Sequence, residues 1–406
     1  MTLDYRQLDW KLIGVVLLLS LIGIITILSA QHDAASDYQR TYYQRQLIWL
    51  AIALLVFAVV VHLPLRLFYA GAYLFYGLAI GLLLLVLLVG ATRMGATRWF
   101  SFGPINLAPS DIAKVAVLLA LARFFAYTKL PPSSKRRLGI SFFAVAVPVL
   151  LILKQPDFGT SLVFWVLLTS MWFWSGLSPI YLLLMLSPIA SMITAAHWLT
   201  WTIYFIVLLA FLFLARPGLI FGVFTVVVNL ATGIFNPILW GLLREYQRNR
   251  ILTFLDPDRD PRGAGYQIIQ SKIAIGSGGI WGKGFQGGSQ TRLEFLPERH
   301  TDFVFSVLAE EFGLWGAALV VLLFGYIFYR AIRIATKCRS RFASNLAAAA
   351  ASILIFQFFV NIGMALGFMP VTGLALPFLS YGGTSLVLSW TLVGFIVLAG
   401  CHWQEY

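Results

Sequence analysis

The chain has 406 residues, of which 60% are hydrophobic and only 11% are charged, and its mean hydropathy is +0.86. Soluble domains carry about a quarter charged residues, so this composition excludes an ordinary soluble protein and predicts an all-α polytopic membrane protein. The formal net charge of +13 does not indicate a nucleic acid partner. Its basic residues gather at the ends of apolar segments, where positive-inside topology and anionic lipid head groups explain them.

Apolar segments of about 20 residues, the length that crosses a bilayer, follow one another along the chain. We expect about 10–12 transmembrane helices, with the least sharply marked divisions between 159 and 243. The expected segments are 12–30, 46–62, 67–90, 109–126, 138–154, 159–176, 179–196, 200–215, 217–243, 303–329, 346–368 and 372–400. The first segment is too long for a typical signal peptide core, so we expect an uncleaved helix.

Basic clusters orient these helices, because Lys and Arg are concentrated on the cytoplasmic side. The clusters flank the first, fourth and tenth segments and comprise Arg6, Lys11, Lys129, Lys135, Arg136, Arg137, Arg330, Arg333, Lys337, Arg339 and Arg341. All lie on one side if the N-terminus is cytoplasmic. We therefore expect a single membrane domain with N-terminal helices in 12–243, a large extracellular loop at 244–302 and C-terminal helices in 303–400.

The polar stretch 244–302 differs from the rest of the chain. Its residues include nine Lys or Arg, seven Asp or Glu, and nine glycines between Gly263 and Gly288. Long connections of this kind are usually functional or disordered. Because apolar and aromatic residues such as Tyr266, Trp281 and Phe295 run through it, we expect a folded active-site loop.

Asp302 ends this stretch, at the point where a new apolar helix begins. An ionisable group at the membrane interface is costly and therefore suggests function. Its carboxylate, with a pKa raised by partial burial, is a candidate general base for a substrate hydroxyl. The alternative is a helix N-cap formed by Thr301 or Asp302. Farther along the helix, Glu310 and Glu311 are expected to be structural or ion-binding partners within the bundle.

Charged residues at other segment ends form a second group of candidates. Arg98 and Trp99 together suit an anionic lipid head group, although an interfacial aromatic belt explains Trp99 equally well. Asp111 and Lys114 are three residues apart and can pair on one helix face. Lys154 and Asp157 flank the next turn. For both this pair and the Asp111–Lys114 pair, the alternative to a functional role is that the two charges only neutralise each other.

The last segment is interrupted by glycine and proline, at Pro370–Gly373 and Pro377–Ser385. A broken helix is tolerated where its free backbone groups line a cavity or pack on protein. Two common motifs fail. Pro261 stands where a calcium loop starting at Asp256 needs glycine, and Gly282-Lys283 lacks the remainder of a P-loop.

Four motifs resemble those of the SEDS (shape, elongation, division and sporulation) family of bacterial cell-wall synthesis. They are Leu255-Asp-Pro-x-x-Asp-Pro-x-Gly-x-Gly-Tyr-Gln267, Ser271-Lys-Ile-Ala-Ile-Gly-Ser-Gly-Gly279, Phe295-Leu-Pro-Glu-x-His-Thr-Asp-Phe303 and Pro377-Phe-x-Ser-Tyr-Gly-Gly383. The resemblance covers nearly the whole chain. Pro370-Val-Thr-Gly373 is similar to the elongation branch, whereas the division branch usually has Pro-Thr-Lys-Gly at this place.

This resemblance implies a peptidoglycan glycosyltransferase that polymerises lipid II (undecaprenyl-pyrophosphoryl disaccharide-pentapeptide) at the outer face of the bacterial cytoplasmic membrane during elongation. The family's essential aspartate falls on Asp302, its extracellular tryptophan on Trp99 and its loop glutamate on Glu294. Two features depart from the family. Its members typically have ten spans, so an extra pair is expected in 179–243, and Asp111 replaces the glutamate of the usual Pro-Ser-Glu.

The implied chemistry assigns further roles. Asp302 would accept the proton of the acceptor 4-hydroxyl, and cations would bind the leaving pyrophosphate. Arg98, Lys114, Arg292 and Arg299 are the candidates, with a divalent cation (Mg²⁺ or Mn²⁺) left open as cofactor. The resemblance implies a class B penicillin-binding protein transpeptidase and other elongation-complex membrane proteins as partners. A lipid II flippase is the alternative, against which the long polar loop argues, since carriers bind near the midplane.

Overall fold

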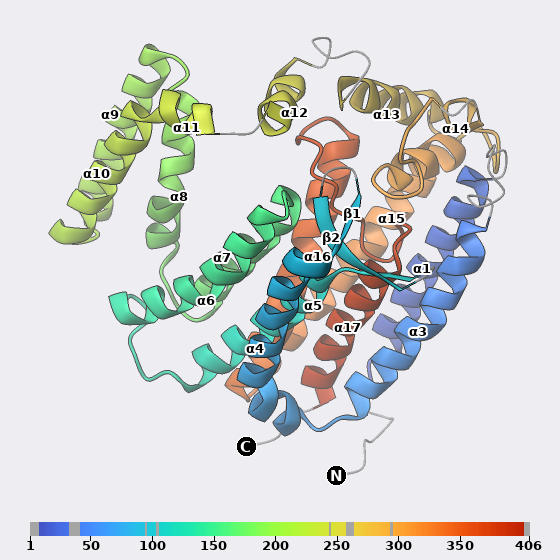
Figure 1. Ribbon diagram of the computed structural model, residues 1–406, viewed down its shortest axis with the longest axis horizontal. Helices are drawn as coiled ribbons and strands as arrows, with labels where there is room; N and C mark the ends of the chain where they lie inside the picture. The colour runs from blue at the N-terminus through green and yellow to red at the C-terminus, as the bar shows by residue number, and fades with distance from the viewer. Residues whose placement is uncertain are drawn as a thin grey trace.

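The computed structural model describes residues 8–31, 41–93, 96–102, 105–242, 245–256, 264–292 and 295–401. Helices dominate these residues and run mostly along one direction, as Figure 1 shows. The expectation of an all-α polytopic membrane protein is confirmed. One small sheet is an exception that the sequence patterns did not indicate.

Each of the twelve apolar segments contains a helix. These helices are α1 (Trp10–Ala30), α3 (Tyr42–His62), α4 (Leu65–Val89), α5 (Pro109–Tyr127), α6 (Lys135–Lys154), α7 (Phe158–Trp174), α8 (Pro179–Thr194), α9 (Trp198–Ala215), α10 (Leu219–Ile234), α15 (Val304–Lys337), α16 (Arg341–Ala365) and α17 (Gly383–Cys401). Within the described ranges, 8 are long and apolar enough to cross a membrane, or up to 9 if α10 and α11 (Asn236–Leu242), bent by 56°, form one span. The difference from the expected number lies in α7 and α8, which are shorter, and in α5, which carries Asp111, Lys114 and Arg123.

The unexpected sheet lies between α4 and α5. Its strands β1 (Ala91–Arg93), β2 (Ala96–Phe102) and β3 (Ile105–Leu107) are antiparallel in that order. Ala91 pairs with Trp99, and Phe100 pairs with Leu107. Strands this short are barely visible in a hydropathy pattern, but Gly90, Gly95 and Gly103-Pro104 in the sequence are turn signals.

The described part of 244–302 is folded, as expected. It contains α12 (Glu245–Leu255), α13 (Ala264–Gly278) and α14 (Ser289–Arg292). Figure 1 shows α12, α13 and α14 at the end of the bundle opposite the two chain termini. Helix α13 packs on α15, so this stretch forms a cap over one end of the bundle.

A backbone interlock joins this cap to α15. The helix breaks at Gly313, whose φ of 63° and ψ of −158° are not helical. The carbonyls of Glu310 and Glu311 instead accept hydrogen bonds from the amides of Lys283 (3.0 Å) and Gly284 (2.9 Å), and the Leu314 amide donates to the Gly279 carbonyl (2.9 Å). The cap therefore satisfies the backbone groups that the break would otherwise leave unpaired in a membrane protein.

The centre of the bundle is built around α17. This helix packs on α3, α15 and α16, and Trp390 within it is fully buried. Before α17, residues 371–382 run without regular helix, which confirms the expected break in the last apolar segment. This extended segment reaches the turn that holds Asp302.

Helices α8, α9 and α10 stand to one side of the bundle (green and yellow-green in Figure 1). Helix α8 packs on α7, while α9 and α10 pack on α8. Buried polar groups connect the three helices. The Asn229 amide donates to Ser187 Oγ (2.8 Å), and the Tyr204 hydroxyl donates to Asn229 Oδ1 (2.8 Å). This network gives the three helices a polar core of their own.

Candidate functional site

Asp302 lies in a tight turn directly before α15. The amides of Thr301, Asp302 and Phe303 all donate to the Glu298 carbonyl at 3.1–3.3 Å. The N-cap of α15 is Phe303, and no side chain caps the helix. The N-cap interpretation of Thr301 or Asp302 is therefore wrong, because both residues precede the cap, and the Asp302 carboxylate is left for another role.

The backbone of this turn is clamped by two neighbouring elements. Asn361 Nδ2, fully buried on α16, donates to the carbonyls of Asp302 (3.0 Å) and Leu374 (2.9 Å). Ser380 Oγ donates to the Thr301 carbonyl (2.6 Å), and the Tyr381 amide donates to the His300 carbonyl (2.8 Å). Residues from α16 and the 371–382 segment thus fix the backbone on which the carboxylate stands.

Burial and charge raise the pKa of Asp302 to about 6. The largest cause is the loss of water around the carboxyl as the protein surrounds it. The negative charge of Glu298 raises the pKa further, and the positive charge of Arg250 lowers it. Gly373, at a φ of 73°, faces the carboxylate, and a Cβ at that position would stand 3.8 Å from Asp302 Oδ2. A carboxyl with this pKa is mostly ionised at neutral pH but more basic than an ordinary aspartate.

The 371–382 segment also meets the first turn of α7. A Cβ on Gly159 would come within 2.4 Å of the Thr372 carbonyl, so only glycine permits this approach. Asp157 caps α7 by accepting a hydrogen bond from the Thr160 amide (3.2 Å). The buried hydroxyl of Thr372 has no hydrogen-bond partner among the described residues. The junction therefore holds an unused polar group near Asp302.

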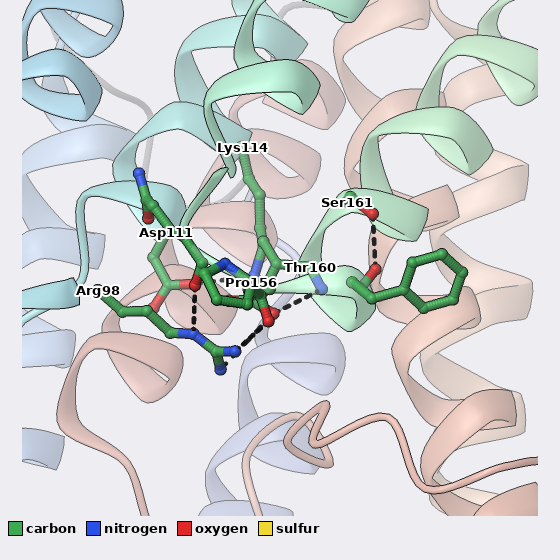
Figure 2. Close-up of polar contacts among 9 residues, drawn as sticks. Arg98, Asp111, Lys114, Pro156, Thr160 and Ser161 are labelled. Atoms are coloured by element: carbon green, nitrogen blue, oxygen red, sulfur yellow. Dashed lines mark hydrogen bonds and ion pairs between the residues drawn. The ribbon is translucent and has the colours of Figure 1, made fainter. Parts of the chain in front are cut away.

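Arg98, on β2, contacts the turn between α6 and α7, as Figure 2 shows. Its Nε donates to the Gln155 carbonyl (3.0 Å), its Nη2 donates to the Pro156 carbonyl, and its Nη1 lies 4.0 Å from Asp157 Oδ1. The guanidinium thus fastens the sheet, with the half-buried Trp99, to the start of α7. To bind a phosphate it would have to exchange these contacts.

Lys114 and Asp111 form the expected ion pair on α5, at 2.8 Å. Lys114 is only 4% exposed. Asp111 lies on the wall of an apolar groove of 570 Å³ between α3, α4, α5 and α17. The apolar walls of this groove include Trp49, Phe68, Leu107, Val387 and Phe395.

The remaining candidates lie in or near the cap. Arg299 is 6% exposed and so points into the protein. Next to it, burial lowers the pKa of His300. Arg292 ends α14, whereas Glu294 lies outside the described residues. The roles given to Asp302, Trp99, Arg98, Lys114, Glu294, Arg292 and Arg299 stay predictions.

The side chains of Glu310 and Glu311 accept hydrogen bonds that help to hold the cap and α1 against α15. Glu310 Oε1 accepts hydrogen bonds from Lys283 Nζ (2.8 Å), Ser289 Oγ (3.2 Å) and the Gln290 amide (3.0 Å). Glu311 accepts a hydrogen bond from Ser29 of α1. Both glutamates are almost fully buried, at 0% and 1% exposure. Their role is therefore structural, which was one of the two expected alternatives.

The sequence analysis did not identify Asn361 or Arg250 as neighbours of Asp302. A polar Asn361 in an apolar helix was a usable signal, because buried polar groups in membrane helices are usually functional or hydrogen-bonded. Nothing in the sequence around Arg250 indicates that its charge acts on Asp302, since the two residues lie on separate elements.

The chain matches the family described as "Cell cycle protein", which groups FtsW, RodA and SpoVE, over residues 9–204 and 180–404. The two matched segments together cover nearly the whole chain. They overlap at 180–204, in the region where helices beyond the usual ten were expected.

Curated relatives are similar along most of their length. Peptidoglycan glycosyltransferase MrdB of Escherichia coli is 37% identical over 400 residues, which cover 98% of this chain and 94% of that protein. A probable peptidoglycan glycosyltransferase FtsW of Alkalilimnicola ehrlichii is 34% identical, with 95% and 88% covered. Stage V sporulation protein E of Bacillus subtilis is 33% identical, with 98% of both chains covered.

Two solved structures share the fold. One is a chain of a peptidoglycan synthase complex, described as coordinating polymerization and crosslinking, with a TM-score of 0.71 and 32% identity over 98% of this chain and 99% of that chain. The other is the rod shape determining protein RodA of Thermus thermophilus, with a TM-score of 0.64 and 26% identity over 98% of both chains.

Proposed function

The chain belongs to the SEDS family of multi-pass membrane proteins, and from this premise we propose that it is a peptidoglycan glycosyltransferase that polymerises lipid II into glycan strands during elongation. One observation carries the proposal. The carboxylate of Asp302 has a raised pKa and lies under a folded cap, and hydrogen bonds from α16 and the 371–382 segment hold the backbone around it. Such a group suits a general base whose pKa lies near the working pH.

In the proposed reaction, Asp302 accepts the proton of the acceptor sugar's 4-hydroxyl. The hydroxyl oxygen bonds to the anomeric carbon of the donor sugar as the bond from that carbon to the pyrophosphate oxygen breaks. Undecaprenyl pyrophosphate leaves with the electron pair of the broken bond. Because pyrophosphate is a good leaving group, the protein mainly has to supply positive charge to it.

Arg250 is the cation best supported for this task, because its charge already acts on Asp302. Lys114, Arg98 and Arg299 are further candidates, although Asp111 and the α6–α7 turn engage the first two. The described residues contain no group of three or more His, Cys, Asp or Glu that could hold a metal ion. A Mg²⁺ or Mn²⁺ ion would be held by the substrate phosphates and would add positive charge there.

The apolar groove between α3, α4, α5 and α17 suits one undecaprenyl tail. Its walls are almost entirely apolar, and Asp111 and Lys114 stand where α5 begins. The tail comes from an equally apolar bilayer, so close packing against these walls, rather than transfer out of water, would hold it in the groove. A lipid-linked sugar bound in this way keeps its head group near the polar end of the bundle.

The proposed setting is the bacterial cytoplasmic membrane, with the N-terminus cytoplasmic and the cap on the external face. The placement of basic clusters supports this orientation. A class B penicillin-binding protein and other elongation-complex membrane proteins are the proposed partners. The similarity to a chain of a peptidoglycan synthase complex supports the first of them.

The test of this function is to add labelled lipid II to the purified chain, with and without the partner transpeptidase, and to assay lipid II movement across liposomes containing the chain. A glycosyltransferase yields long glycan strands. Translocation of lipid II without strands would support the flippase instead and would overturn the proposal.

A further inference from the structure

A basic pocket lies at the end of the bundle opposite the cap. It has a volume of 280 Å³ and is lined by Arg330, Arg333, Ile334 and Lys337 of α15 and by Gly400 of α17. The three cations are spaced three and four residues apart, so they share one face of α15. Asp302, the proposed base, precedes the first turn of α15, whereas this pocket lies at the other end of that helix. The pocket takes no part in the proposed reaction.

The pocket carries excess positive charge. Arg330 is paired with Asp9, the N-cap of α1, with Nε at 2.8 Å from Oδ2. Among the described residues, the Arg333 side chain contacts the hydroxyl and the ring of Tyr329, at 3.3 Å and 5.9 Å, and no acidic group. The side chain of Lys337 makes no hydrogen bond or ion pair with any residue in the described ranges. Like charges at this spacing repel each other, so an anion between Arg333 and Lys337 would stabilise the pocket.

Two exposed aromatic residues place the pocket at the depth of lipid head groups. Trp10 begins α1 beside Asp9 and is 59% exposed, and Tyr329, beside Arg330, is 57% exposed. Aromatic side chains of this kind are enriched at the membrane–water interface. The floor of the pocket is apolar, because Ile334 packs over Gly400, where a Cβ would stand 3.6 Å from the Ile334 side chain.

We propose that this pocket binds the head group of an anionic phospholipid. The lipid phosphate lies between Arg333 and Lys337, while the first methylenes of the lipid lie against Ile334 and Gly400. Basic pockets between membrane helices are suited to such head groups. A free phosphate shares the charge but lacks the chains that would contact the apolar floor.

The experiment is native mass spectrometry of the full chain, titrated with phosphatidylglycerol or phosphatidylcholine. The test variant is Arg333→Gln/Lys337→Gln. The matched control is Arg339→Gln/Arg341→Gln, which removes the same charge from exposed residues at the same end of the bundle. Each basic residue near an anionic lipid contributes about five-fold to affinity, so the test variant should bind phosphatidylglycerol about 25-fold more weakly.

We expect wild type and control to retain phosphatidylglycerol in preference to phosphatidylcholine, and the test variant to lose that preference. Gly400→Val, which fills the pocket without changing charge, should lose it as well. Equal loss in the control would show diffuse charge attraction and overturn the proposal. So would the absence of retained lipid on wild type, or competition by inorganic phosphate at the same concentration as the lipid.

Discussion

At the scale of single residues, Asp302 is the proposed base, and its ionisation also affects the stability of the protein. Its pKa of about 6 in the folded protein lies above the ordinary aspartate value of 3.8. The folded protein therefore holds an extra proton between these values, and the stability contributed by this group falls as pH rises through the window. Ionised Asp302 thus costs folding free energy at neutral pH, as is common for groups positioned for function.

Replacing this residue should stabilise the protein where the wild type is ionised. Asp302→Asn should raise the free energy of unfolding above pH 6 by about 1–3 kcal/mol, the lower values reflecting partial exposure. Below about pH 4 the difference should vanish. Thermal unfolding in detergent at pH 4 and pH 8 measures it, and a variant less stable than wild type at pH 8 would contradict the electrostatic account.

Two neighbours should shift the acidic limb of the pH–activity profile in opposite directions. The Glu298 charge raises the pKa of Asp302 and the Arg250 charge lowers it. Glu298→Gln should therefore move the rise in activity to lower pH, and Arg250→Gln should move it to higher pH. Initial rates of lipid II polymerisation between pH 5 and 8 test this pair, and shifts in the same direction would count against it.

The sequence located Asp302 but not the residues that hold it. Asp302 ends a charged stretch, and an apolar helix follows it directly. This change in hydropathy can be read from a few neighbouring residues. Asn361 and Ser380 act across 59 and 79 residues, through contacts that only the packed chain creates. Local patterns carry no information about such pairings, so the clamp around the carboxylate could not be predicted.

At the scale of elements, the interlock between the cap and α15 depends on close backbone approach. A Cβ on Gly282 would stand 2.1 Å from the Glu311 carbonyl oxygen, whereas a Cβ on Gly284 meets nothing within 4 Å. Both glycines have positive φ, 78° and 86°. Substitution at either position therefore carries the same strain but a different steric cost.

Gly282→Ala should destabilise the protein by more than about 3 kcal/mol, because a backbone carbonyl must move. Gly284→Ala should cost only about 1–2 kcal/mol, the strain of a left-handed alanine. Thermal unfolding of both variants in detergent gives the comparison. Equal losses would mean that the cap does not rest on α15 through this contact.

The positions of the helices could be predicted from the sequence, but the breaks within them could be predicted only in part. Apolar runs of about 20 residues predicted the twelve described helices that lie in the apolar segments, and prolines and glycines marked the break before α17. The break at Gly313 was missed, because an isolated glycine in an apolar helix is common. The short sheet was missed because its strands have 3, 7 and 3 residues, too few for a clear alternation.

At the scale of the whole molecule, the apolar groove between α3, α4, α5 and α17 is the proposed site of a lipid tail. Gly71 of α4 lines the groove, and Gly77 on the same helix does not. A Cβ at either position meets nothing within 4 Å, so both positions accept a larger residue. These two glycines form a matched pair for testing where the lipid tail binds.

Gly71→Leu should raise KM for lipid II about ten-fold by displacing part of the tail. It should change kcat little, because Asp302, the proposed base, is untouched. Gly77→Leu should leave both constants unchanged. Steady-state polymerisation kinetics distinguish the two variants. An unchanged KM in Gly71→Leu would place the lipid tail elsewhere.

The most direct test of the account is glycan-strand synthesis from labelled lipid II by wild type, Asp302→Asn and Asp302→Ala across pH 5–8. We expect wild-type activity to rise through about pH 6 and the activity of both variants to fall at least about 100-fold while they remain folded. Normal strand synthesis by folded Asp302→Ala would contradict the central claim that this carboxylate is the base.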